Sequence, residues 1–194
     1  MKSRIATGVV VANVGPEWIL VPGRESFASP ELLQDWAASA ARAKTLARPE
    51  AFEWLSLSLT AVAASGNPDE LRAVYLPSVE ADLALVRVIA AGHDTDTGDL
   101  ALAVGVEDPA AIETPIVEPF TAAGLGEGVR AVRFHVGGED RSVTGIVAYA
   151  FAVAGTVVRV SYADADLTRL TNLSAIVDDF VGAITMQYGE PPTR

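Results

Sequence analysis

The stretch that decides the fold reads VTGIVAYAFAVAGTVVRVSY and covers residues 143–162. It contains two runs of β-branched, aromatic and small apolar residues, and Gly155-Thr156 between them is a tight-turn signal. The stretch therefore predicts two antiparallel strands. The first strand, residues 143–153, is apolar at nearly every position, so we expect it to be buried on both faces, by the chain's own helices or by a partner.

Further strands are expected on both sides of this hairpin, wherever short apolar runs are bounded by Gly, Pro or polar turns. These runs cover residues 5–12, 17–21, 71–76, 83–90, 100–106, 116–121 and 129–136. Because residues 83–90 and 100–106 flank a polar segment, they predict a second hairpin.

Two helices are expected in the first third of the chain. Ser29 is a suitable N-cap and Pro30 fits the first helical position. The apolar residues that follow recur at helical spacing, and they are Leu32, Leu33, Trp36, Ala40 and Ala43. Residues 49–65 fit both the strand period and the helix period, but the run is too long for one ordinary strand, which favours a helix.

The C-terminal segment predicts an amphipathic helix that closes the domain. Its apolar side chains are spaced by three and four residues, and they are Leu173, Ile176, Val177, Phe180, Val181 and Ile184. We expect Asn172 to cap this helix, and Pro191-Pro192 to end the ordered chain.

The order of elements is strands, one or two helices, a run of antiparallel strands and a closing helix. This order differs from the regular alternation of a parallel sheet. The sequence therefore predicts an α+β fold, with a largely antiparallel β-sheet flanked by helices. We expect one domain over residues 1–190 and a disordered tail over residues 191–194.

Composition and charge exclude several classes of protein. The chain has 194 residues, with 14 Lys and Arg against 25 Asp and Glu, which gives a net charge of −11, and it has no Cys. The missing Cys rules out disulfides and thiolate sites, and the negative charge argues against binding nucleic acid or an anionic membrane. Residues 5–14 are too short and too interrupted for a signal peptide. We expect a cytoplasmic protein, from a bacterium with a GC-rich genome because Arg replaces Lys.

The negative charge is concentrated in one zone. Between Arg87 and Arg130 there is no basic residue, and the acidic residues there include Asp94, Asp96 and Asp99. This spacing resembles a calcium loop, but the sixth position is Asp99 where an EF-hand has Gly, and the twelfth lacks Glu. A solvated turn is the favoured interpretation, and we expect no metal and no cofactor.

Other motifs favour structural interpretations. Residues 124–128 read GLGEG, but a strand follows them instead of the helix that a phosphate-binding loop needs, so we expect a hairpin connection. The pairs Asp164 with Asp166 and Asp178 with Asp179 are interpreted as caps, turns or a polar helix face. No catalytic motif is present.

The three tryptophans lie in the first third of the chain at Trp18, Trp36 and Trp54. Trp36 is expected in the core, because it is in phase with the apolar face of its helix. Trp18 precedes a short strand and is expected to be partly exposed. A ligand cleft lined by all three is the alternative to aromatic core packing.

The second half of the chain resembles the PsbP-like α/β sandwich family. The residues that carry this likeness are 124–130, the hairpin 143–162 and the closing helix 172–186. The resemblance implies a non-catalytic accessory or binding protein. Bacterial members of that family are often exported lipoproteins, and this chain has no Cys that could be lipidated.

The favoured functional hypothesis is a non-enzymatic binding or accessory module that presents an acidic surface to a basic protein partner. Its binding residues would be Asp94, Asp96, Asp99 and Trp18.

Two alternatives remain open. One is a small hydrolase or isomerase with a site that combines His135, Arg133 and an Asp. The other is a homodimer subunit whose apolar strands pair across a two-fold axis.

Overall fold

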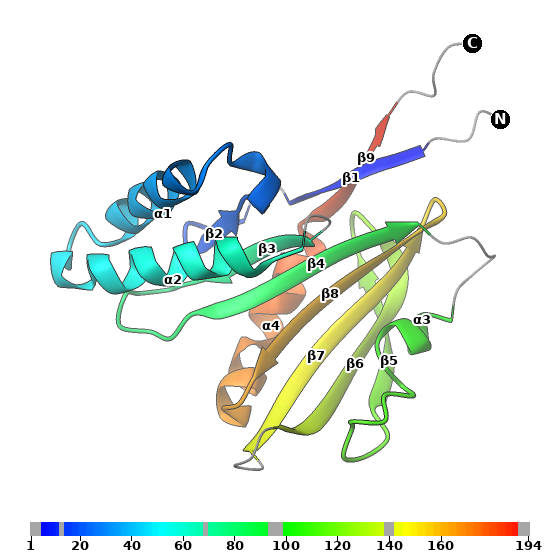
Figure 1. Cartoon of the computed structure of the whole chain (residues 1–194). Coiled ribbons are helices and arrows are strands. Elements are labelled where there is room, and N and C mark those ends of the chain that lie inside the picture. The colour runs from blue at the N-terminus through cyan, green and yellow to red at the C-terminus, as the bar shows by residue number, and fades with distance from the viewer. Residues whose placement is uncertain (1–4, 12–13, 68–69, 93–98, 138–141, 190–194) are drawn as a thin grey trace, which may run out of the picture. The chain divides into compact units, whose positions relative to one another are not determined.

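The computed structural model describes residues 5–11, 14–67, 70–92, 99–137 and 142–189, and Figure 1 shows its elements. The chain divides into two compact units. We call residues 15–87 the helical unit, and residues 1–14 with 88–194 the sheet unit. Strand β4 (Ala84–Gly92) begins in the helical unit and ends in the sheet unit. Helices and antiparallel strands occur in both units, so the predicted α+β class is confirmed.

In the helical unit, two helices pack side by side next to a pair of antiparallel strands (Figure 1). The strands are β2 (Trp18–Val21) and β3 (Glu70–Tyr75). The helices are α1 (Pro30–Lys44) and α2 (Phe52–Ser65), and short 3-10 turns η1 (Arg24–Ser26) and η2 (Pro49–Ala51) precede them.

Helix α1 begins as the sequence predicts, because the Ser29 hydroxyl accepts a hydrogen bond from the backbone N–H of Leu32. Its buried residues are Leu33, Ala37 and Ala41. The buried face of the helix is therefore rotated slightly from the predicted apolar stripe. Leu32, which the prediction placed on that stripe, is half exposed. Small residues at Ala37 and Ala41 let α2 approach closely.

The ambiguous segment 49–65 is helical over α2, which confirms the choice made from its length. Leu55, Leu59 and Ala63 are fully buried at the i, i+4 spacing of a helix. The alternating Ser and Leu residues, which suggested a strand, place Leu57 on the opposite and exposed side of this helix.

The sheet unit is built on four antiparallel strands in the order β8-β7-β6-β5. Their bounds are Ile116–Ala122 for β5, Gly126–Gly137 for β6, Ser142–Val153 for β7 and Thr156–Asp164 for β8. The expected hairpin is β7–β8, and its turn has positive φ at Ala154 (50°) and Gly155 (79°), as a type I′ turn requires.

Strand β7 lies between β6 and β8, and it is buried on both faces as predicted. Both of its edges are hydrogen-bonded within its own unit. Residues 145–151 of β7 are paired on both sides, so a second copy cannot add a strand along them. The homodimer alternative itself stays a prediction.

The two faces of β7 differ in side-chain size. Tyr149 lies on the face covered by α4 (Leu167–Gly182), whereas Ala148 and Ala150 pack against Val104 after the one-turn helix α3 (Leu100–Ala103). Figure 1 shows α4 and α3 at different sides of these strands. Small residues on one face make room for the short helix.

Residues 100–106 were expected to form a strand, and that prediction is wrong. The Asp99 carboxylate accepts a hydrogen bond from the backbone N–H of Ala101 and so caps α3. Gly105, at φ 82°, then reverses the chain. A cap before the segment and a left-handed glycine inside it stop the apolar run from extending as a strand.

The N-cap of the closing helix lies six residues earlier than predicted. Asp166, and not Asn172, is its N-cap, and its carboxylate accepts hydrogen bonds from the backbone N–H groups of Thr168 and Arg169. The helix ends at Gly182, and the residues after it form β9 (Ile184–Gly189), which pairs antiparallel with β1 (Ile5–Val11).

None of the helices within the described ranges is both long enough and apolar enough to cross a membrane. The predicted tail 191–194 lies outside the described residues. The single domain over residues 1–190 stays a prediction.

Candidate functional site

The predicted acidic binding residues are only partly described. Asp94 and Asp96 lie outside the described residues, and Asp99 is used as the cap of α3. Trp18 lies on β2 in the other unit, where its partly buried ring packs 5.0 Å from the ring of Tyr75. The described part of the chain contains no group of three or more Asp, Glu or His arranged to hold a metal ion.

The residues of the hydrolase hypothesis do come together in the sheet unit. Asp108 follows α3, and its carboxylate lies 3.2 Å from Nε2 of His135 and 3.7 Å from Nε of Arg133, both on β6. The cluster fastens a loop to the sheet, because Arg133 also donates a hydrogen bond to the carbonyl of Val104. Its use in catalysis stays a hypothesis.

The carboxylate of this cluster is already engaged. Asp108 accepts a hydrogen bond from the backbone N–H of Ala110, and this bond lowers the pKa of Asp108, with smaller contributions in the same direction from His135 and Arg133. Nε2 of His135 is close to the carboxylate but is not aligned for a hydrogen bond. The carboxylate therefore holds the loop more directly than it orients the imidazole.

A second cluster secures the start of α4. The buried Asp164 carboxylate accepts hydrogen bonds from the Tyr162 hydroxyl, from Nε of Arg169 at 2.6 Å and from the backbone N–H of Asp166 at 2.9 Å. Burial alone would raise the pKa of Asp164, but these bonds outweigh it and hold the pKa below its ordinary value. The acid pair at residues 164 and 166 is thus structural, as predicted.

A third cluster joins α4 to the sheet. The hydroxyl of the fully buried Tyr149 donates to the carboxylate of Asp178 at 2.6 Å, and Arg130 lies over the Tyr149 ring and bonds to Glu118 at 2.5 Å. Burial, and then Asp178, raise the pKa of Tyr149, so it stays a hydrogen-bond donor. Asp178 therefore binds a buried partner, whereas it was expected on the polar face of the helix.

The helical unit contains a buried arginine that the sequence did not single out. Arg72 on β3 is 1% exposed, and one of its terminal nitrogens donates to the carbonyl of Ala63 in the last turn of α2. A cation at this end of a helix complements the partial negative charge of its carbonyls. A side chain at Gly66 would collide with the guanidinium, which explains the glycine at this position.

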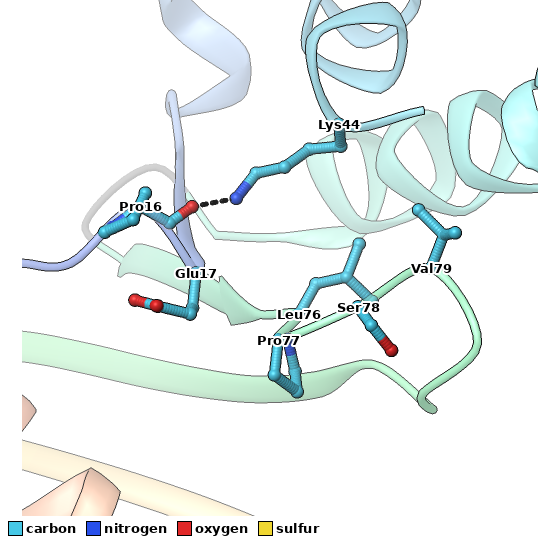
Figure 2. Close-up of a pocket in the computed structure, with 7 residues that line it drawn as sticks. All are labelled: Pro16, Glu17, Lys44, Leu76, Pro77, Ser78 and Val79. Carbon is cyan, nitrogen blue, oxygen red and sulfur yellow. Dashed lines mark hydrogen bonds between the residues drawn. The ribbon is translucent and has the colours of Figure 1, made fainter. Parts of the chain in front are cut away.

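A small pocket of about 160 Å³ lies where α1 ends (Figure 2). Lys44 reaches across it and donates a hydrogen bond to the carbonyl of Pro16, while Leu76, Pro77, Ser78 and Val79 lie along another wall. Burial lowers the pKa of Lys44, and the nearby Glu17 carboxylate acts in the opposite direction. The ammonium ties α1 to the turn before β2.

A larger cavity of about 320 Å³ lies in the helical unit, where the start of α1 meets the end of α2. Its lining residues are Arg24, Phe27, Ala28, Ser29, Pro30, Leu33, Gln34, Thr60 and Ala64. This volume is at the lower end of the range for small-molecule sites, about 300–1,000 Å³. Sequence analysis missed the cavity, because its walls come from two segments, residues 24–34 and 60–64, that are far apart in the sequence.

The glycine-rich segment is the hairpin connection that was predicted. Residues 122 and 126 are paired at the end of β5 and β6, and Gly126 has a φ of 84°. A side chain at Gly128 would collide with the Phe151 ring and the carbonyl of Ala150 on β7. These glycines allow a turn and close packing of the strands, which is the hairpin role that was favoured over a phosphate-binding loop.

The alternative of a ligand cleft lined by the three tryptophans is not supported by the ring contacts. Trp36 packs 5.9 Å from Phe27 and Trp18 packs on Tyr75, while Trp54 is exposed on α2. Trp36 contributes to the core of the helical unit, as predicted.

The chain matches no protein-family model, no curated protein and no solved structure. The resemblance to the PsbP-like family therefore stays an expectation, and the function has to be argued from the geometry alone.

Proposed function

We propose that the protein is a non-enzymatic binding module and that the cavity between α1 and α2 holds its ligand. The cavity is the observation that carries this proposal, because it is of ligand size and opens on the surface of the helical unit above the buried core residue Leu33.

The lining indicates the chemistry of the ligand. Phe27, Leu33 and Ala64 supply apolar surface, while the guanidinium of Arg24 and the amide of Gln34 supply hydrogen-bond donors. The Ser29 and Thr60 hydroxyls already bond to the backbone of their own helices. The walls suit a small molecule with an apolar body and one carboxylate or similar acceptor group.

Octanoate is a suitable probe, and octanol is its uncharged counterpart. Titration of the full chain followed by NMR should give saturable shifts for backbone amides of residues 24–34 and 60–64. Bound octanoate should also raise the melting temperature, because it binds only the folded state. Shifts that are weak, linear in concentration and spread over the surface would contradict the proposal.

Two variants sharpen this test. Ala28→Phe should fill the cavity and abolish binding, while Ala43→Phe, at an exposed position of α1 outside the lining, should leave binding unchanged. Arg24→Gln should weaken binding of octanoate by about tenfold and leave binding of octanol unaltered, because only the carboxylate uses the guanidinium. Equal binding by Ala28→Phe and Ala43→Phe would place the ligand elsewhere.

An acidic surface for a basic partner is the second candidate. Glu107, Glu113 and Glu127 are exposed in the sheet unit, and no described cation pairs with them. An oligolysine peptide should bind at low salt and be released at high salt. Changing these three residues to Gln should weaken that binding; an unchanged affinity would remove this candidate. A cytoplasmic location belongs to the same proposal.

A further inference from the structure

Helix α2 has a second apolar face that its own unit does not use. Trp54 and Leu57 are 44% and 65% exposed, and Ala61 and Ala64 follow them on the same side. The spacing of three, four and three residues forms one stripe, which we call the outer stripe. Glu53 is the one charged residue in α2, so the stripe itself is uncharged.

The outer stripe is self-complementary in shape. Its large residues, Trp54 and Leu57, lie toward the start of the helix, and its small residues, Ala61 and Ala64, lie toward the end. If two such helices run antiparallel, Trp54 meets Ala64 of the other copy and Leu57 meets Ala61. Large side chains then fill the space over small ones along the whole contact.

The neighbouring helix is complementary in charge under the same two-fold operation. Arg42 on α1 lies over the Phe52 ring at the start of α2, with 5.4 Å between the guanidinium carbon and the ring centre. Asp35, two helical turns earlier on α1, shares that side, and Glu31 precedes it by one turn. Because α1 and α2 run in opposite directions, the cation lies at one end of the stripe and the carboxylates at the other.

From these two patterns we infer that the outer stripe of α2 is a homodimer interface in which a second copy packs antiparallel, with Arg42 of each copy beside Asp35 and Glu31 of the other. The two-fold makes every contact occur twice. Each copy carries a net charge of −11, so two copies repel each other over most of their surface. The uncharged stripe, with Arg42 at its end, is where this repulsion is weakest.

Edge pairing through β5 is a weaker route to a dimer. Pro119 in the middle of this strand has no N–H, and the neighbouring Glu118 carries a charge, two features that protect strand edges from pairing. Ala64 belongs both to the outer stripe and to the lining of the proposed ligand site, whereas Leu57 and Ala61 lie outside that lining, so substitution of Leu57 tests the interface separately from the ligand.

Light scattering coupled to size-exclusion chromatography tests the interface on the full chain. The wild type should elute with twice the mass of 20.2 kDa at micromolar concentration. Leu57→Glu should raise the dimer dissociation constant by roughly 30-fold or more, since it places a charge at the centre of the contact. Leu46→Glu, the same change at a 78% exposed position off the stripe, should leave the dimer intact.

Reversing the charges of the paired residues distinguishes this specific interface from nonspecific association. Arg42→Glu should weaken the dimer, and Arg42→Glu combined with Asp35→Arg and Glu31→Arg should restore it, because the pairs form again with reversed signs. Circular dichroism confirms that each variant is folded. A wild type that is monomeric at all concentrations, or an equal effect of Leu57→Glu and Leu46→Glu, would overturn the inference.

Discussion

Helices α2 and α4 both cover antiparallel strands, but the residues on their outer faces differ in polarity. The outer side of α4 carries polar residues such as Thr168, Thr171 and Asp179. The outer side of α2 carries Trp54 and Leu57. Helix α4 therefore buries its apolar face within its own unit, whereas α2 keeps apolar surface that its unit does not bury. This exposed apolar surface of α2 is the proposed interface.

Helices α4 and α1, one from each unit, also begin differently. The start of α4 is secured by the buried Asp164 with bonds from two side chains and the backbone, whereas α1, which pairs with α2, begins with one hydroxyl of Ser29. We therefore expect that removing a buried contact at α4 lowers the free energy of unfolding more than removing the cap of α1 does.

The largest effect is expected from Phe180→Ala on α4. This side chain is fully buried, so its removal should lower the free energy of unfolding by about 3–5 kcal/mol. Urea unfolding followed by circular dichroism measures the change. Leu46→Ala, at an exposed turn, should change stability by less than about 0.5 kcal/mol.

Tryptophan fluorescence, recorded during the same urea unfolding, shows how the helical unit responds. All three tryptophans belong to the helical unit, so tryptophan fluorescence reports on that unit alone. A small loss from Phe180→Ala, similar to that from Leu46→Ala, would contradict the view that α4 is held by its buried face.

The next effect is expected from Asp164→Asn, which keeps the shape of the side chain and removes its charge. The variant should be less stable by about 1–3 kcal/mol at pH 7, because Arg169 and Tyr162 lose a charged acceptor. Urea unfolding at several pH values measures this difference.

The pH dependence has a definite sign. The pKa of Asp164 is lower in the folded state than its ordinary value of 3.8, so the folded state favours the charged form. The carboxylate therefore stabilises the fold above that value, and the stabilisation is lost as the pH falls below it. The difference between wild type and Asp164→Asn should shrink below about pH 4; a difference that stays constant down to pH 2 would show that the charge is irrelevant.

The smallest effect is expected from Ser29→Ala, which removes the cap of α1. It should cost about 1 kcal/mol, and Ser29→Gly should cost less. Tryptophan fluorescence is the suitable measurement, because Trp36 lies on this helix. If Ser29→Ala destabilises the protein as much as Asp164→Asn does, the contrast between the two helix starts is wrong.

The sequence by itself determined the elements whose signals are local. The turn at Gly155, the apolar strand before it, the cap at Ser29 and the helical period of α4 were all readable, because each depends on neighbours a few residues apart. Local signals failed where two of them competed. The apolar run after Asp99 became a helix through its cap, and Asp166 prevailed over Asn172 as the cap of α4.

Only the tertiary structure decided which polar residues meet. His135 and Asp108 are twenty-seven positions apart, and Lys44 and Pro16 are twenty-eight, so no spacing rule could pair them. The cavity and the outer stripe of α2 depend on which helix faces are already covered. A sequence specifies that a face is apolar, but only packing shows whether that face is buried, because burial is a property of the neighbours.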